Sequence, residues 1–169
     1  MKKIKIDKTK GIFFYIQGLS GSGKTSIGKK IKKKIEKLYG PTLFFNGDNL
    51  RKIFKLYDYS YKGRILNIEK FIKLSKFVTN QRINIILTVV GMMENPRKWN
   101  KKHIKNYIEI YIKADLKKII KLKKKKIYKN KKTKNIVGLN ISPEFPKKPA
   151  IVINNNFKNS IDYLSKKLI

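Results

Sequence analysis

The stretch Gly18-Leu19-Ser20-Gly21-Ser22-Gly23-Lys24-Thr25 decides the fold, because it fills every position of the pattern G-x-x-x-x-G-K followed by Ser or Thr. The apolar residues 12–16 precede it and predict a buried strand. Behind it, apolar residues recur at the spacing of one helix face: Ile27, Ile31, Ile35 and Leu38. A strand, a glycine-rich loop and a helix in this order form a cradle in which backbone N–H groups point at phosphate oxygens.

This loop predicts a bound nucleoside triphosphate. Lys24 is placed to reach the β- and γ-phosphates, and the Thr25 hydroxyl is placed to bind Mg²⁺. An ordinary glycine-rich turn before a helix is the alternative, and the complete motif between a strand and a helix disfavours it. The residues expected to bind ATP are Gly18, Ser20, Gly21, Ser22, Gly23, Lys24, Thr25 and Ser26.

The length and composition predict one globular domain over residues 1–169, of which 41% are apolar. The chain has no cysteine, which excludes disulfides, thiolate metal sites and a cysteine nucleophile, and which fits a reducing cytoplasm. Charged residues follow Met1 within a few positions, and no apolar run approaches the roughly 18 residues of a membrane span. We therefore expect a soluble, cytoplasmic protein with no membrane partner.

The net charge of +33 raises the question of nucleic-acid binding. Lysines make up 39 of the 43 basic residues, and they are spread over nearly every segment. A dedicated nucleic-acid surface more often has arginines, which form bidentate contacts, in a local patch. We interpret the charge as compositional background typical of an AT-rich genome. It predicts salt-sensitive, non-specific binding of polyanions and no specific nucleic-acid partner.

Apolar runs and helical patterns alternate along the rest of the chain. Further strands are predicted over residues 42–45, 84–90, 107–112 and 150–153. Further helices are predicted after Asp48, up to about Arg82, from Asp115 to Leu122 and after the last strand. The run 84–90 is apolar almost throughout, as is typical of a parallel strand that is buried on both faces. The pattern predicts a three-layer α/β P-loop NTPase fold, with a parallel sheet of about five strands flanked by helices. Ligands are expected at the carboxyl ends of these strands.

Asp48 follows the second predicted strand, at the sheet edge where the glycine-rich loop also lies. A carboxylate there can act as a general base and can organise the metal ion. It can also be no more than the cap of the short helix that follows. We favour the catalytic role, because the chain has only 10 acidic residues and few others lie at the carboxyl end of a strand.

Residues 117–134 form a low-complexity, lysine-rich segment. It is either a solvated helix end, in which like charges repel, or a lid that closes cations over the transferring phosphates. The sequence leaves both interpretations open.

Several motifs, in order along essentially the whole chain, resemble the adenylylsulfate (APS) kinase family of P-loop kinases. The loop G-L-S-G-S-G-K-T has the wording typical of that family, and residues 46–51 resemble its D-G-D-N-x-R. Tyr59-Ser60 resembles its F-S, and Arg64 with Asn67-Ile68 matches its D-R-x-x-N-I-R. Residues 125–128 stand where the family has K-G-L-Y, 135–139 where it has N-F-T-G-I, and 142–149 where it has S-P-Y-E-x-P-x-x-P.

The resemblance implies phosphoryl transfer from ATP, with Mg²⁺, to the 3′-hydroxyl of a nucleotide whose 5′-phosphate carries a second group. Adenylylsulfate, which becomes 3′-phosphoadenylylsulfate, is the parent acceptor. The implied catalytic residues are Lys24 and Asp48, and the implied metal ligands are Thr25 and Asp48. The residues expected to bind the acceptor are Asp48, Arg51, Tyr59, Arg64, Asn67, Lys125 and Ile136.

The acceptor side departs from the family pattern. Asn46 replaces an aspartate, Glu69 replaces an arginine, and residues 90–93 replace its I-S-P-Y-R. Ile136 replaces a phenylalanine that stacks on the acceptor base, which leaves Tyr59 as the expected aromatic partner. The acceptor is therefore either adenylylsulfate or another nucleotide, such as the cytidine diphosphoramidate of capsular-polysaccharide modification. The oligomeric state is open between a monomer and a homodimer.

Two functions of other kinds share parts of these features. A nucleotide-binding module without turnover, whose basic surface binds nucleic acid, is disfavoured because Lys24, Thr25 and Asp48 are all present. A gluconate- or shikimate-type kinase shares the loop and the length but does not explain residues 142–149.

Overall fold

The computed structural model describes residues 6–122, 124–128 and 134–168. Its five strands form one sheet in which every neighbouring pair is parallel. The order of the strands in the sheet is β2-β3-β1-β4-β5, so that the strand before the glycine-rich loop lies in the middle. Their bounds are β1 (Phe13–Gln17), β2 (Thr42–Asn46), β3 (Asn84–Val89), β4 (Tyr107–Lys113) and β5 (Ile151–Asn154). The predicted α/β class and parallel sheet are confirmed.

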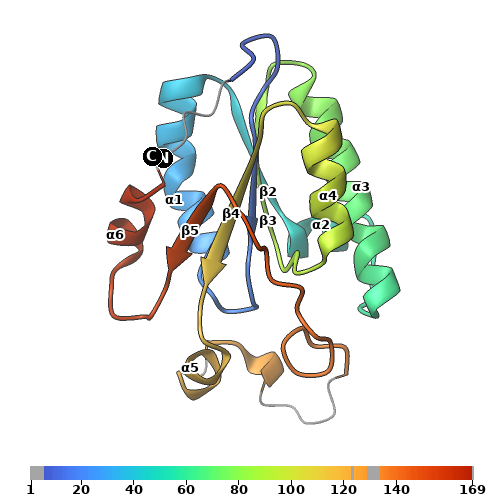
Figure 1. The fold of residues 1–169 in the computed structure, drawn as a ribbon, viewed down its shortest axis with the longest axis vertical. Helices are drawn as coiled ribbons and strands as arrows, with labels where there is room; N and C mark the ends of the chain where they lie inside the picture. The colour runs from blue at the N-terminus through green and yellow to red at the C-terminus, as the bar shows by residue number, and fades with distance from the viewer. Residues whose placement is uncertain (1–5, 123, 129–133, 169) are drawn as a thin grey trace.

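Helices cover both faces of the sheet (Figure 1). One face carries α1 (Lys24–Tyr39) and α6 (Ile161–Lys166), and the other carries α3 (Tyr61–Thr79) and α4 (Glu94–His103). The short helices α2 (Gly47–Ile53) and α5 (Leu116–Lys121) follow β2 and β4, and the 3₁₀ helix η1 (Lys126–Tyr128) comes after α5. The three predicted layers are therefore present. Within the described ranges, no helix has both the length and the apolar character needed to cross a membrane.

Each face of the sheet has its own apolar core, because alternate residues of a strand point to opposite faces. Residues of β1 contribute to both cores, one shared with α3 and the other with α1. Ile27, Ile31 and Ile35 of α1 are buried, as their spacing predicts. Leu38, the fourth apolar residue on the predicted helix face, is not buried with the other three. Its side chain is 53% exposed, because it lies in the last turn of α1 beside the chain reversal at Gly40.

The helix after β2 is capped by Asn46 rather than by Asp48. The Asn46 side-chain oxygen Oδ1 accepts hydrogen bonds from the backbone N–H groups of Asp48 (3.0 Å) and Asn49 (3.2 Å). The interpretation of Asp48 as the cap is therefore wrong, because β2 extends to residue 46 and the cap falls on this last strand residue. The carboxylate of Asp48 is not used to cap α2.

Helix α4 is missing from the sequence prediction, because its buried face is polar. The buried residues on it are Pro96, Arg97 and Asn100. Arg97 Nε lies 3.5 Å from Oε1 of Glu109, a β4 carboxylate that is only 2% exposed. Gln17 Nε2 donates to the same oxygen at 2.7 Å, and Lys101 Nζ lies 3.1 Å from Oε2. These contacts tie α4 to β4 and to the last residue of β1.

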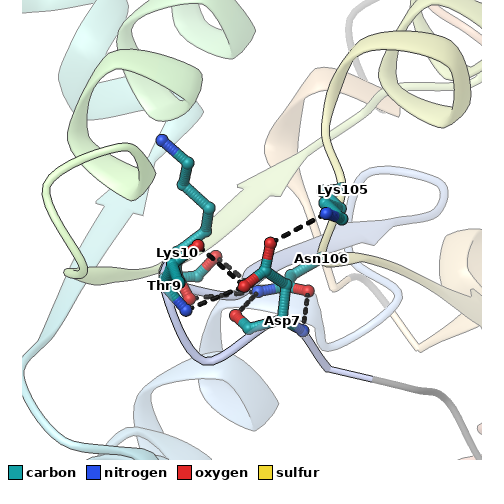
Figure 2. A network of polar contacts seen from close by, with 6 residues as sticks. Asp7, Thr9, Lys10, Lys105 and Asn106 are labelled. Carbon is teal, nitrogen blue, oxygen red and sulfur yellow. Dashed lines mark hydrogen bonds and ion pairs between the residues drawn. The ribbon is translucent and has the colours of Figure 1, made fainter.

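A polar network lies at the end of the sheet away from the loop (Figure 2). Asn106 accepts a hydrogen bond from the Asp7 N–H (2.9 Å) and donates to the carbonyl oxygens of Asp7 (2.8 Å) and Lys10 (3.0 Å). The Asp7 carboxylate accepts from the Thr9 hydroxyl at 2.7 Å and pairs with Lys105 at 3.0 Å. Hydrogen bonds from Thr9 and the ion pair with Lys105 lower the pKa of Asp7. The network anchors the segment before β1 to the segment before β4.

Candidate active site

A cavity of about 680 Å³ lies at the carboxyl ends of the strands, where a parallel sheet predicts a ligand site. One wall is the glycine-rich loop with the start of α1. A second part of the lining, called here the second wall, comes from α2, the segment before α3, α3 itself and residues 134–137. The β3 residues Thr88 and Val89 line the cavity as well.

The glycine-rich loop packs closely against the sheet. A Cβ atom on Gly18 would lie 2.5 Å from the carbonyl oxygen of Ile112 on β4, so that no side chain fits there. Gly23, the last residue before α1, has a φ of +96°, in the region that favours glycine. These positions explain why the pattern requires glycine at both ends of the loop.

Lys24 is buried at the start of α1 and lines the cavity. Its Nζ donates a hydrogen bond to the carbonyl oxygen of Leu19 at 2.7 Å. Burial lowers the pKa of Lys24 to about 7, while the negative charge of Asp48 opposes this shift and the positive charge of Lys125 adds to it. Lys24 therefore interacts electrostatically with residues of two other segments of the cavity wall.

Thr25, Asn46 and Asp48 meet at one side of the cavity. The Thr25 hydroxyl accepts a hydrogen bond from Asn46 Nδ2 at 3.1 Å. Mg²⁺ in phosphoryl-transfer sites takes one or two protein ligands, and substrate phosphates and waters complete its shell. The Thr25 hydroxyl and the Asp48 carboxylate fit that donor set. An all-protein metal cage is not formed by the described residues, among which no three His, Cys, Asp or Glu side chains cluster suitably.

Arg51, Tyr59 and Arg64 form a cationic and aromatic part of the second wall. The guanidinium carbons of Arg51 and Arg64 lie 4.8 and 5.4 Å from the centroid of the Tyr59 ring. Arg64 also donates to the carbonyl oxygens of Tyr59 (2.9 Å) and Asn135 (2.8 Å). Burial, together with the charge of Arg51, lowers the pKa of Arg64 to about 10. Two partly desolvated guanidinium groups of this kind can bind a phosphate group in a bidentate manner.

Most of the predicted site residues lie in the cavity wall. Asn67 does not, because it is buried and its Nδ2 donates to the carbonyl oxygen of Asp58 at 3.1 Å. It supports the segment that carries Tyr59. Gly18 and Ser22 also lie outside the lining, and the Ser22 carbonyl accepts a hydrogen bond from Asn155 at 3.0 Å. The predicted residues that do line the cavity are Ser20, Gly21, Gly23, Lys24, Thr25, Ser26, Asp48, Arg51, Tyr59, Arg64, Lys125 and Ile136.

The departures from the family pattern are divided between the cavity and the rest of the molecule. Asn46, Val90 and Ile136 line the cavity. Met92 and Met93 are buried in the core that α3 shares with the sheet, and Glu69 lies on α3 outside the lining. Ile136 is therefore the departure that presents an apolar aliphatic side chain where the resemblance implies a stacking aromatic ring.

Residues after β5 line the cavity and were not predicted. Asn155 Nδ2 donates to the Ser22 carbonyl, and its Oδ1 accepts from the N–H of Phe157 at 2.9 Å. Phe157 has a φ of +64°, an uncommon conformation for an aromatic residue. Ile161 follows at the start of α6. The available signal was the run of asparagines 154–156 at the end of a predicted strand, which the same edge-of-sheet rule singles out.

The described part of the lysine-rich segment lies beside the phosphate loop. The Tyr128 hydroxyl donates to the carbonyl oxygen of Ser20 at 3.1 Å. Lys124 Nζ lies 5.4 Å from the centroid of the Phe157 ring, and Lys124, Lys125 and Lys134 all line the cavity. Positions 123 and 129–133 of the predicted lid, 117–134, are outside the described residues.

A family model for adenylylsulphate kinase matches residues 10–154 of the chain. The cytidine diphosphoramidate kinase of Campylobacter jejuni is 36% identical over 159 residues, which cover 92% of this chain and 92% of that protein. The adenylyl-sulfate kinase of Clostridium acetobutylicum is 31% identical over 155 residues, or 88% of this chain and 77% of that protein. The matched family and both relatives are kinases.

The fold is also that of solved kinases of this kind. The structure of the APS kinase of Mycobacterium tuberculosis in complex with AMPPNP and APS is similar with a TM-score of 0.83. The similarity covers 94% of this chain and 95% of that one, at 20% sequence identity. The α/β P-loop architecture expected from the sequence is thereby confirmed.

Proposed function

Since the chain belongs to the adenylylsulphate kinase family and is a nucleotide kinase, we propose that it transfers the γ-phosphoryl group of ATP to the 3′-hydroxyl of a nucleotide whose 5′-phosphate carries a second group. One observation carries the proposal. A single cavity has the phosphate loop on one wall and the group Arg51, Tyr59 and Arg64 on the other. A donor phosphate and an acceptor nucleotide can therefore both bind in this one cavity.

The donor side needs positive charge near the transferring phosphoryl group. The loop backbone holds the triphosphate, and Lys24 compensates the charge that develops on the β- and γ-phosphate oxygens. The Thr25 hydroxyl and the Asp48 carboxylate would hold Mg²⁺, which neutralises the same oxygens when it is bound. Lys124 and Lys125, which line the cavity, add cations beside the loop.

Asp48 is the proposed general base. It lies on α2, in the wall that also carries Arg51, and its charge influences the pKa values of both Lys24 and Arg51. A position that interacts with both the loop lysine and Arg51 suits a group that accepts the proton of the attacking 3′-hydroxyl. Because Asn46 already caps α2, the Asp48 carboxylate is available for this role.

Two acceptors are consistent with this site, and the first is adenylylsulfate. The family match and the adenylyl-sulfate kinase relative support it. Cytidine diphosphoramidate is the second, because the C. jejuni relative is 36% identical over 92% of the chain. Ile136 in the cavity wall favours the second acceptor, since one stacking face is worth about 1–3 kcal/mol per base and a smaller pyrimidine depends less on two faces. We further propose a cytoplasmic location, because ATP is the co-substrate.

A coupled ADP-release assay tests both the reaction and the acceptor. Adenylylsulfate and cytidine diphosphoramidate are compared at equal concentrations with ATP and Mg²⁺. A tenfold or greater preference in kcat/KM for adenylylsulfate corresponds to about 1.4 kcal/mol of activation free energy. Such a result would mean that the changed residues of the cavity wall do not alter the choice of acceptor. A preference for the cytidine compound makes Ile136 a candidate specificity determinant, which Ile136→Phe then tests. Turnover of neither compound contradicts the proposed reaction.

A further inference from the structure

Asn46 connects the two walls of the cavity. Its Nδ2 donates to the hydroxyl oxygen of Thr25 at 3.1 Å and lies 3.4 Å from that of Thr88. Its Oδ1 accepts from two backbone N–H groups at the start of α2, the helix that carries Asp48 and Arg51. One side chain thus joins the first turn of α1, the end of β3 and the acceptor-side helix.

These contacts determine how the Asn46 amide is oriented. Backbone N–H groups can only donate, so the atom that faces Asp48 and Asn49 must be the oxygen. The NH₂ group then faces Thr25, whose hydroxyl oxygen has two lone pairs and one proton. Asn46 uses one lone pair of Thr25 and leaves the other for a ligand in the cavity.

The neutrality of Asn46 affects the charge of the nucleotide site. Among the described residues that line the cavity, Asp48 is the carboxylate, whereas the cations are Lys24, Arg51, Arg64, Lys124, Lys125 and Lys134. A second carboxylate at position 46, next to Thr25, would repel phosphate oxygens unless a metal ion lay between them. An amide at this position does not impose that requirement.

We propose that Asn46 allows this chain to bind ATP without Mg²⁺, by holding Thr25 and α2 in place with a neutral side chain. The inference rests on the proposed use of ATP. Asn46 is a positioning residue here: it orders the Thr25 hydroxyl and the start of α2 before any metal ion binds.

Calorimetric titration with ATP, in EDTA and in excess Mg²⁺, measures the ratio of the two dissociation constants. For the wild-type protein, we expect the dissociation constant in EDTA to be no more than about tenfold larger than that in Mg²⁺. For Asn46→Asp, we expect this ratio to be at least about tenfold larger than for the wild-type protein, because binding in EDTA is weaker. Asn46→Asp keeps an oxygen that can cap α2, so it changes the charge and the donor to Thr25 while preserving the cap. Asn46→Ser, which also keeps a cap but is neutral, is the matched control and should keep the wild-type ratio.

Three outcomes overturn the inference. Equal weakening by Asn46→Asp in EDTA and in Mg²⁺, or the same widening in Asn46→Ser, shows that the charge at position 46 does not set the metal dependence. A wild-type ratio of several hundredfold also contradicts it. If the wild-type protein binds no ATP under either condition, the proposed function fails together with the inference. Thermal unfolding of each variant checks that the fold is retained.

Discussion

At the scale of single residues, Lys24 combines a buried position with an ionisable group. Its amino group donates to the Leu19 carbonyl, and burial lowers its pKa from 10.5 to about 7. Phosphate oxygens favour the charged form of a nearby lysine and therefore raise its pKa. Binding of a nucleotide is thus linked to binding of a proton at Lys24.

We predict that ATP binding takes up close to one proton at about pH 8 and almost none at about pH 6. At a pH above its lowered pKa, Lys24 is mostly neutral before ATP binds. The nucleotide raises this pKa, so Lys24 gains a proton when ATP binds. Calorimetry in buffers of different ionisation enthalpy measures this uptake. Lys24→Arg keeps its charge throughout, so an equal uptake by that variant would assign the proton to another group.

Asp48 is the second residue with a separable role. We predict that Asp48→Asn slows phosphoryl transfer by roughly 10²-fold or more, while ATP affinity changes little, because the variant lacks the proposed general base. Stability should change little, since Asn46 provides the cap of α2. Single-turnover kinetics measure the rate, and Asp162→Asn, which removes an exposed carboxylate of α6, is the matched control. Normal turnover at saturating ATP with lost ATP affinity would make Asp48 a binding residue.

At the scale of elements, predictability follows from where the residues are buried. The three central strands β1, β3 and β4 could be predicted because parallel strands buried on both faces are continuous apolar runs. Helix α4 could not, because Arg97 and Asn100 occupy its buried face and leave no apolar period. The glycine-rich loop could be predicted because it is a local sequence pattern. The hydrogen bonds between Asn46 and Thr25 and between Asn155 and Ser22 could not, because each joins segments that are distant in the sequence. Strand order is also a long-range property, and no local signal contains it.

The segment around α5 and η1 supports a prediction at the same scale. We expect the amides of Leu116–Lys121 and Lys126–Tyr128 to exchange more slowly with ATP and acceptor than without them, because phosphate charge screens the repulsion between lysines. Hydrogen exchange measured by mass spectrometry tests this. Tyr128→Phe, which removes the hydroxyl bonded to Ser20, should reduce the difference. Equal exchange in both states favours the solvated helix end over the lid.

At the scale of the whole molecule, the chain has 43 basic and 10 acidic residues, and this imbalance creates a positive potential around the fold. The charges are distributed over many elements; α1 alone has exposed Lys29, Lys30, Lys33 and Lys37 on its outer side. Such a field attracts anionic nucleotides and polyanions alike, and salt weakens both effects.

We predict that the protein binds DNA without sequence preference and with a steep salt dependence. Two duplexes of unrelated sequence should bind within about twofold of each other, and affinity should fall by orders of magnitude between about 50 and 200 mM salt. Fluorescence anisotropy measures both. A tenfold or larger preference for one sequence would support a dedicated nucleic-acid function instead.

If the acceptor base stacks on Tyr59 as proposed, the contact of two arginines with this ring has a consequence for the order of events during acceptor binding. The guanidinium groups of Arg51 and Arg64 already contact the Tyr59 ring in this structure. A base that stacks on Tyr59 must displace a guanidinium group from a ring face that it occupies. The arginine released in this way becomes free to meet the anionic 5′ group of the same acceptor. Acceptor capture is then an exchange of partners, in which rearrangement of the wall, rather than diffusion, can limit the association rate.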